Sequence, residues 1–401
     1  MKRLFSRFSA GLAGRRAVAA WLLLMSCAGL AQPTAPVYIA FDGAYGVKTN
    51  TAAKAIELGI LAAIEEINAR GGVLGGRPLK LLTSDNQGVS ARARDNYLEH
   101  AARADVVAVL AGKFSPLTVE TVAAAHEARV PLISVWGSAD PITDHGRRPS
   151  FVFRLSLKDR WGVEAMLRRA RDVHRAQRVC SILPNTAWGR SGEAVLKAQA
   201  PRLSVTLAVT RWYNWGDQRF GDILAACQTS GAQAIVLVAN EVEAALIVRE
   251  MAQQPASRRI PIVSHWGLTG GVMHELAGEA LDAVDLQVIQ TFTFIGNTRP
   301  RAQRLATWLV REGRLESERD IVSPVGSAHA YDMTHLLASA VERAGSTRGD
   351  DVRRALERLP YFEGAVRDYT PAFTPERHDA LGPEQVLFVR VERSGALTPL
   401  K

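Results

Sequence analysis

The sequence predicts an α/β protein of two similar lobes, each with a parallel sheet covered by helices. Short apolar segments alternate with helical segments along most of the chain, which favours strands of parallel sheets with helices on both faces. The alternation occurs as two series, each about the size of one domain. The length of 401 residues also allows two or three domains.

The first helix, its closing turn and the next strand are the clearest elements. Isoleucine recurs at the three- and four-residue spacing of one helix face, at Ile56, Ile60, Ile64 and Ile67. Gly71 and Gly72 follow, and glycine tolerates the left-handed backbone of a helix end. The apolar run 79–82 then predicts a strand.

The other elements follow from the same patterns. In the first series the expected strands are 37–41, 106–110, 131–134 and 151–155. In the second series they are 178–183, 205–209, 234–238 and 261–264. Helices are expected at 299–318 and 323–344, and a last strand at 386–391.

Residues 1–31 have the pattern of a secretory signal peptide. Arg15 and Arg16 precede an apolar run, and small residues follow at Gly29 and Ala31. Cleavage after Ala31 would give an exported protein, and a lipid anchor at Cys27 is the alternative. No other segment approaches the ~20 apolar residues that span a bilayer.

The charge of the chain argues against nucleic-acid binding. The formal net charge is +9, but residues 1–31 carry five basic residues and no acids, so the remainder carries +4. No stripe of Lys and Arg with interleaved aromatic residues occurs.

Two cysteines remain outside the leader, Cys180 in an expected strand and Cys227 in a helical segment. A disulfide between them is one alternative in an oxidising compartment. We favour two separate buried thiols, since free cysteine behaves as a small apolar side chain. No CxxC, HExxH or clustered His/Cys pattern predicts a metal or other cofactor.

Two segments that occur in this order resemble periplasmic solute-binding proteins of the leucine/isoleucine/valine-binding type. They are GILAAIEEINARGGVLGGRPLKLLTSDNQ and VVAVLAGKFSPLTVETVAAAHEARVPLIS. The resemblance runs from about Val37 to Val391. It implies a type I periplasmic binding protein fold, in which three crossings form a hinge beneath a cleft. Lobe 1 would comprise 33–153 and 288–362, and lobe 2 would comprise 154–287 and 363–401.

The expected ligand contacts of lobe 1 follow two of its strands. Ligands of open α/β sheets bind at the carboxyl ends of strands, beside helix N-termini. In the family such loops bind a ligand carboxylate, which implies that role for Ser115 or Thr118 and for the loop Gly137, Ser138 and Ala139. Capping of the following helix is an equally simple role for Ser115.

Lobe 2 departs from the family pattern. The resemblance places Trp188 where a ring covers the ligand, and Asn240 and Glu241 follow the strand at 234–238. Amino-acid-binding relatives carry an acid near the position of His265 and Trp266, which pairs with the ligand ammonium. Glu241 could replace that acid, but a ligand with a neutral amine or none fits more simply.

Aromatic residues at strand ends predict a ring-lined pocket. Trp136, Trp188 and Trp266 each follow an expected strand, and Trp161 opens the helix after a lobe crossing. Stacked indoles can hold a flat aromatic ligand or a quaternary ammonium. We also expect Tyr45 and Tyr331 at the hinge side of the cleft, and we expect Trp266→Ala to weaken binding while the unliganded fold stays intact.

The favoured function is capture of a small solute in the cleft and delivery to an ABC permease of the inner membrane, by a periplasmic monomer. The ligand classes considered are amino acids, aromatic carboxylates, amides and quaternary amines. A ligand-sensing subunit of a receptor or regulator is the alternative. An enzyme has no support, because no G-x-S-x-G elbow, P-loop or nucleophile-base arrangement occurs.

Overall fold

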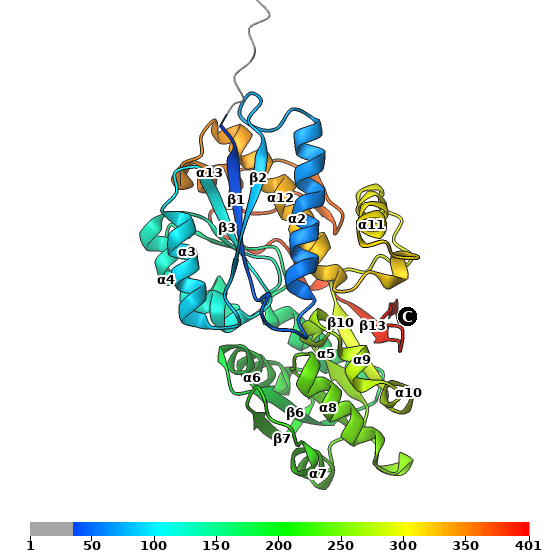
Figure 1. Cartoon of the computed structure of the whole chain (residues 1–401). Helices are drawn as coiled ribbons and strands as arrows, with labels where there is room; N and C mark the ends of the chain where they lie inside the picture. Colours follow the sequence, from blue (N-terminus) through cyan, green and yellow to red (C-terminus); the bar gives the residue numbers. More distant parts are fainter. Residues whose placement is uncertain (1–34, 401) are drawn as a thin grey trace, which may run out of the picture. The chain divides into compact units, whose positions relative to one another are not determined.

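The structure is a computed structural model that describes residues 35–400. The expected leader at 1–31, with Cys27, lies outside the described residues. The described strands form two large sheets and one two-stranded hairpin, which confirms the predicted α/β class (Figure 1).

The first sheet has five parallel strands in the order β2-β1-β3-β4-β5. Its strands are β1 Val37–Gly43, β2 Leu79–Asp85, β3 Val106–Ala111, β4 Leu132–Ser134 and β5 Val152–Arg154. Two helix pairs pack with it, one on each side of β1 to β3 in Figure 1. They are α2 Ala52–Ala69 with α12 Pro324–Ala344, and α3 Ser90–Ala101 with α4 Ser115–Ala128. The helix α13 Gly349–Leu356 packs against α12.

The sequence pattern of α2 matches its packing. The isoleucines of the predicted face are all buried in the core, at Ile56, Ile60, Ile64 and Ile67. Gly71 and Gly72 have φ values of 101° and 75°, which glycine adopts at little cost. This helix end turns the chain into β2 as predicted.

The second sheet is mixed, in the order β14-β13-β10-β9-β8-β6-β7. Its strands are β6 Arg178–Pro184, β7 Thr206–Tyr213, β8 Ala234–Leu237, β9 Ile262–Ser264, β10 Leu286–Gln290, β13 Leu387–Val391 and β14 Leu397–Pro399. Five strands run parallel. The strand predicted at 386–391 is β13, whereas its antiparallel pairing and the edge strand β14 were not predicted. We also missed β10, because Gln287 and Gln290 interrupt its short apolar run.

Helices of the second half follow the same alternation. They are α5 Asp159–Asp172, α6 Ala187–Gln199, α7 Gly221–Thr229, α8 Glu241–Ala252, α9 Met273–Ala277, α10 Ala280–Ala283 and α11 Pro300–Gly313. The expected helix at 299–318 ends at Gly313, and Arg314 has a left-handed backbone there. Within residues 35–400 no helix is long and apolar enough to cross a membrane.

The chain passes between the two sheets three times: after β5, after β10 and before β13. One segment differs from the expected division. Residues 363–380 contact the first-sheet side. The backbone N–H of Ala380 donates to the carbonyl of Arg154 at 2.9 Å. The N–H of Ala365 donates to the carboxylate of Asp332 in α12 at 2.6 Å. Only β13 and β14 of 363–401 pair within the second sheet.

Cys180 of β6 and Cys227 of α7 form a disulfide, with their Cα atoms 5.4 Å apart. Our prediction of two separate thiols is therefore wrong. Both residues are fully buried, as expected, but the packing of α7 on the second sheet brings their sulfur atoms together.

Candidate functional site

A small cavity, called here the inner cavity, lies where strand ends of the two sheets meet, and its water-accessible volume of about 10 Å³ leaves room for about one water molecule in this closed arrangement. Seven of the expected site residues line it: Ser115, Trp136, Ser138, Trp188, Asn240, His265 and Trp266. Three further lining residues were not predicted: Lys113, Phe114 and Gly267.

The loop after β4 is held rigidly at the edge of this cavity. The Ser115 hydroxyl accepts hydrogen bonds from the N–H groups of Ser138 at 3.0 Å and Ala139 at 3.2 Å. The hydroxyls of Ser134 and Ser156 donate to the Gly137 carbonyl, at 2.9 and 2.7 Å. These bonds hold Ser115 against the loop at 137–139 and occupy the N–H groups of Ser138 and Ala139.

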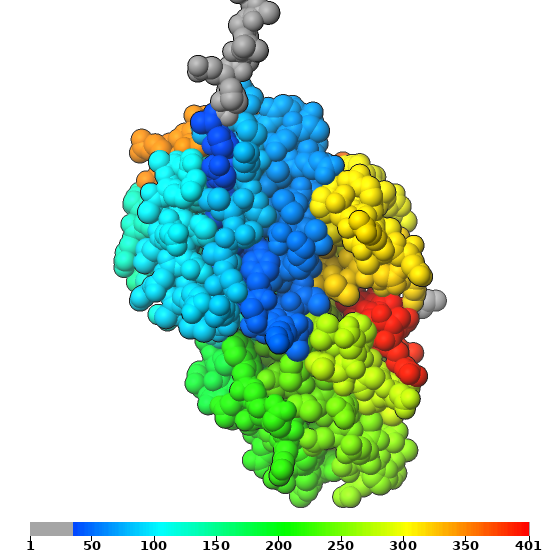
Figure 2. Space-filling view, viewed as in Figure 1, coloured from blue at the N-terminus to red at the C-terminus, as the bar shows by residue number. Residues whose placement is uncertain are grey.

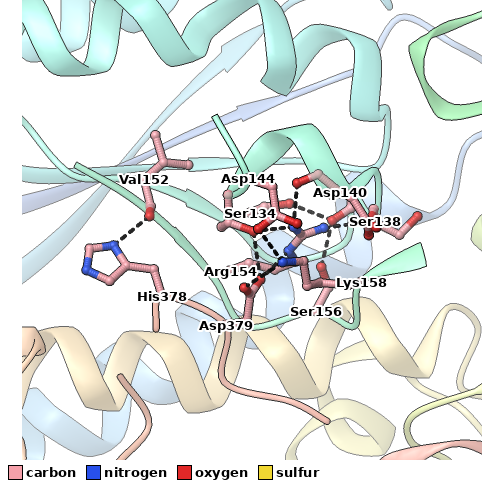
Figure 3. Close-up of polar contacts among 12 residues, drawn as sticks. Ser134, Ser138, Asp140, Asp144, Val152, Arg154, Ser156, Lys158, His378 and Asp379 are labelled. Atoms are coloured by element: carbon pink, nitrogen blue, oxygen red, sulfur yellow. Dashed lines mark hydrogen bonds and ion pairs between the residues drawn. The ribbon is translucent and has the colours of Figure 1, made fainter. Parts of the chain in front are cut away.

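Arg154, which is fully buried, supports the same loop from behind (Figure 3). Its guanidinium donates to the carbonyls of Ser138 at 2.6 Å and Ala139 at 3.0 Å. It also pairs with Asp379 at 2.8 Å, and Lys158 reaches the other oxygen of that carboxylate at 3.3 Å. Burial alone would raise the pKa of Asp379, but Arg154 and Lys158 outweigh it and hold that pKa below its usual value.

Three aromatic rings from the second-sheet side form the opposite wall. The ring of His265 lies 4.1 Å from that of Trp266 and 5.0 Å from that of Trp188. A Cβ added at Gly267 would lie 2.4 Å from the benzene edge of Trp188, so only glycine lets this indole approach. Trp266 is 1% exposed and belongs to the core, so Trp266→Ala would leave a void and destabilise the unliganded protein by about 3–5 kcal/mol. The expected intact fold of that variant is therefore not supported.

Two indole N–H groups at the inner cavity have no hydrogen-bond partner within the described structure. They belong to Trp136 and Trp188, which are 1% and 5% exposed. The benzene edge of Trp136 packs against Gly270 and Gly326. A buried N–H without an acceptor is unfavourable, so both donors are available for an acceptor atom of a ligand.

Glu241, the expected substitute for the ammonium-binding acid, already has partners. Lys113 forms an ion pair with it, and the Thr49 hydroxyl donates to its other oxygen at 2.8 Å. The side chains of Lys113 and Glu241 are 2% and 3% exposed.

A second buried acid lies behind the aromatic wall. Nε2 of His265 faces a carboxylate oxygen of Asp159 at 3.3 Å, and Nδ1 of His265 accepts from the N–H of Gly267 at 3.3 Å. The N–H of Asp159 donates to the Ser138 carbonyl at 2.8 Å. Burial, together with the charge of Asp159, raises the pKa of Asp140 to about 6.

Segments from the two sides close over this region. The N–H of Thr51 donates to the Gly270 carbonyl at 3.1 Å, and the Ser191 hydroxyl of α6 accepts from the N–H of Asp140 at 2.9 Å. In Figure 2 the blue segment near residue 50 lies directly on the yellow-green segment near residue 270. The inner cavity is thus enclosed by residues of both sides.

Four expected site residues lie elsewhere. Tyr45 packs edge-on against Phe41, and the hydroxyl of Tyr331 donates to Glu66 of α2 at 2.7 Å. Thr118 lines a separate cavity with a water-accessible volume of about 20 Å³, and Trp161 lines another of about 450 Å³ beside Asp379. None of these four lines the inner cavity, and neither do three other expected site residues, Gly137, Ala139 and Glu241.

The buried His329 of α12 connects this region to the crossing after β10. Its Nδ1 lies 2.9 Å from the Val135 carbonyl, which can only accept, and its Nε2 lies 2.9 Å from the Thr291 hydroxyl. The neutral ring therefore donates from Nδ1 and accepts at Nε2. Burial lowers the pKa of His329 to about 4.

We expect His329 to make the protein sensitive to acid. Between about pH 6.5 and about pH 4 the His329 ring is protonated in the unfolded chain but neutral in the folded chain. The unfolding free energy therefore falls as the pH falls through this range. When the pH is lowered from 7 to 4.5, the unfolding free energy of His329→Gln, measured with urea, should fall by about 2 kcal/mol less than that of the wild type. Equal losses in the two proteins would contradict this role.

No group of three or more His, Cys, Asp or Glu side chains within residues 35–400 is arranged to hold a metal ion. Two buried cations escaped the sequence analysis. Arg154 could have been suspected, because it is a charged residue inside the apolar run of β5. Lys113 could have been suspected from its place directly after β3.

Comparisons with known proteins agree with this architecture. A sequence model described as periplasmic binding protein matches residues 36–396, while a search of curated proteins found no match. A type 1 periplasmic binding protein from Bordetella pertussis is 21% identical, with a TM-score of 0.79 over 91% of this chain and 100% of its own.

Two similar structures contain ligands. The branched-chain amino acid substrate-binding protein LivJ from Streptococcus pneumoniae, in complex with isoleucine, is 21% identical, with a TM-score of 0.75 over 91% of this chain and 99% of its own. A solute-binding protein from Rhodopseudomonas palustris, in complex with 4-hydroxybenzoate, is 15% identical, with a TM-score of 0.76 over 91% and 96%. These likenesses show a shared fold, and the family match covers most of the sequence. The chain therefore belongs to the periplasmic binding protein family.

Proposed function

We propose that this protein is exported to the periplasm, binds a small organic acid in the inner cavity and delivers it to an ABC permease. The two sides close on the solute as a hinged trap, and the closed form docks on the permease. Solute-binding proteins of similar fold in complex with isoleucine and with 4-hydroxybenzoate give precedent for both amino acids and aromatic acids.

The observation that carries the proposal is the pair of unpartnered indole N–H groups in an otherwise closed aromatic cavity. A ligand with several acceptor atoms, such as a carboxylate, can accept hydrogen bonds from both indole N–H groups. An ammonium group has only donors and cannot accept from either of them. The acid Glu241, which pairs with the lining residue Lys113, has a partner on each oxygen. Once the two sides open, a planar carboxylate with its ring against the wall of Trp188, His265 and Trp266 fits this arrangement better than leucine or valine.

A thermal-shift screen of the mature protein tests the proposal. It compares aromatic carboxylates, aliphatic amino acids, small amides and quaternary amines. A ligand at one hundred times its dissociation constant stabilises the folded form by about 2.7 kcal/mol, which raises the unfolding midpoint by several degrees. We expect the largest shift with an aromatic carboxylate.

Trp188→Phe is the matched variant, because it keeps an aromatic ring and removes one N–H. It should reduce the shift by the acid and leave the midpoint of the unliganded protein nearly unchanged. A screen in which no compound shifts the wild type would refute the proposed function.

A further inference from the structure

The ion pair of Lys113 and Glu241 joins the two sides of the molecule beside the inner cavity. Lys113 is the second residue after β3 of the first sheet, and Glu241 is the first residue of α8, which follows β8 of the second sheet. Both side chains are almost completely buried. Each therefore depends on the other for charge compensation.

Both oxygens of Glu241 have a partner. One oxygen of Glu241 receives Lys113, and the other accepts from the Thr49 hydroxyl at 2.8 Å. Lys113 donates in addition to the Gly270 carbonyl at 3.3 Å. Each oxygen of Glu241 therefore already has a partner, and Glu241 does not line the inner cavity, where an ammonium group of a ligand would lie.

The pair stands between two spaces. A second space, called here the outer cavity, has a water-accessible volume of about 200 Å³, and its lining includes Phe114, Asn240, Glu241 and Glu243. Phe114 and Asn240 line both spaces, while Lys113 lines the inner one and Glu241 the outer one. The ion pair is thus part of the partition between them.

Other acids near these spaces are covered. Glu243 of the outer cavity accepts from the N–H of Gly216 at 3.0 Å. Asp159 lies behind His265 and does not line the inner cavity. Glu241 is thus the acid that a change at Lys113 would free.

We propose that Lys113 is a specificity-determining residue, which excludes amines from the inner cavity by occupying Glu241. The inference rests on the proposed function and specifies which ligands the same site rejects. While Lys113 occupies Glu241, a cationic ligand would lose its water without gaining an acceptor, and its charge would lie beside a buried ammonium. An acid of the same shape meets that ammonium and the two indole donors.

The test compares 4-hydroxybenzoate with 4-hydroxybenzylamine, which share a ring and differ in the sign of the charged group. Affinities are measured by titration calorimetry on the whole mature protein. The wild type should prefer the acid at least a hundredfold. Lys113→Met should free Glu241 and tighten binding of the amine at least tenfold.

Matched variants separate charge from packing. The double variant Lys113→Met with Glu241→Met removes both charges and should gain no amine affinity. Glu241→Gln keeps the shape, leaves Lys113 unpaired and should tighten binding of 4-hydroxybenzoate at least fivefold. This variant also keeps the test decisive if Lys113→Met does not fold.

Three results would overturn the inference: a wild type that binds the amine as tightly as the acid, an equal amine gain in the double variant, or an acid affinity unchanged in Glu241→Gln. Failure of every compound in the thermal-shift screen is a different result, because it would remove the proposed function itself.

Discussion

Arg154→Met should lower the unfolding free energy by about 3–5 kcal/mol and abolish binding of the acid found in the screen. Removing one partner of a buried ion pair costs about this much, and the buried carbonyls of Ser138 and Ala139 lose their donor as well. Here the remaining charge is Asp379, which is 14% exposed and would keep Lys158 and the Thr143 hydroxyl. Urea unfolding measures the loss of stability.

The loss of binding has a separate cause. Arg154 donates to three consecutive carbonyls, those of Ser138, Ala139 and Asp140. Without these donors the loop is no longer held with its N–H groups toward Ser115, and buried carbonyls lose their partners. The geometry of the proposed carboxylate subsite therefore depends on a residue that does not line the inner cavity.

Two further variants test whether the donors of Arg154 are the cause. Arg154→Lys keeps the charge but loses the planar fork of donors, so it should recover part of the stability and little of the binding. Arg348→Met removes an arginine whose side chain is 78% exposed and should change stability by less than about 0.5 kcal/mol. If Arg154→Met unfolds at the same urea concentration as the wild type, the supporting role is wrong.

The sequence predicted those site residues whose placement follows from strand order. Ser115, Ser138, Asn240 and His265 come within a few residues of the ends of β3, β4, β8 and β9. Parallel strands of one sheet end at the same edge, so residues that follow them meet there. No knowledge of side-chain packing is needed for this step.

Residues on helices were predicted less well, because their direction depends on how the helix is rotated against its neighbours. Tyr331 belongs to α12 and faces Glu66 of α2, while Trp161 of α5 faces away from the inner cavity although Gly162 packs near Trp266. Thr118 lies one turn after Ser115 on α4 and lines a different cavity. Periodicity gives the spacing of a face but not which neighbour that face meets.

Contacts between distant segments could not be predicted from the sequence, for a different reason. Lys113 and Glu241 are 128 positions apart, and their contact exists only where the two sides close on each other. The second case is the disulfide, whose cysteines are 47 positions apart on a strand and a helix. Burial of each cysteine was predictable, but the distance between them depends on the packing of α7.

The disulfide should contribute about 4 kcal/mol to the unfolding free energy. A cross-link between residues 47 positions apart restricts the unfolded chain, and the loop-closure relation gives this size for such a loop. Urea unfolding with and without a thiol reductant measures it, after incubation at each urea concentration long enough for the exposed bond to be reduced. The reductant should move the transition of the wild type to lower urea.

The control is the double variant Cys180→Ala with Cys227→Ala, whose transition should not respond to the reductant. This variant should also be less stable than the reduced wild type, because it lacks two sulfur atoms in a fully buried place. Identical transitions of the wild type with and without reductant would show that the cross-link is absent in solution. Because disulfides persist in oxidising compartments, its presence in the purified exported protein would also agree with the proposed periplasmic location.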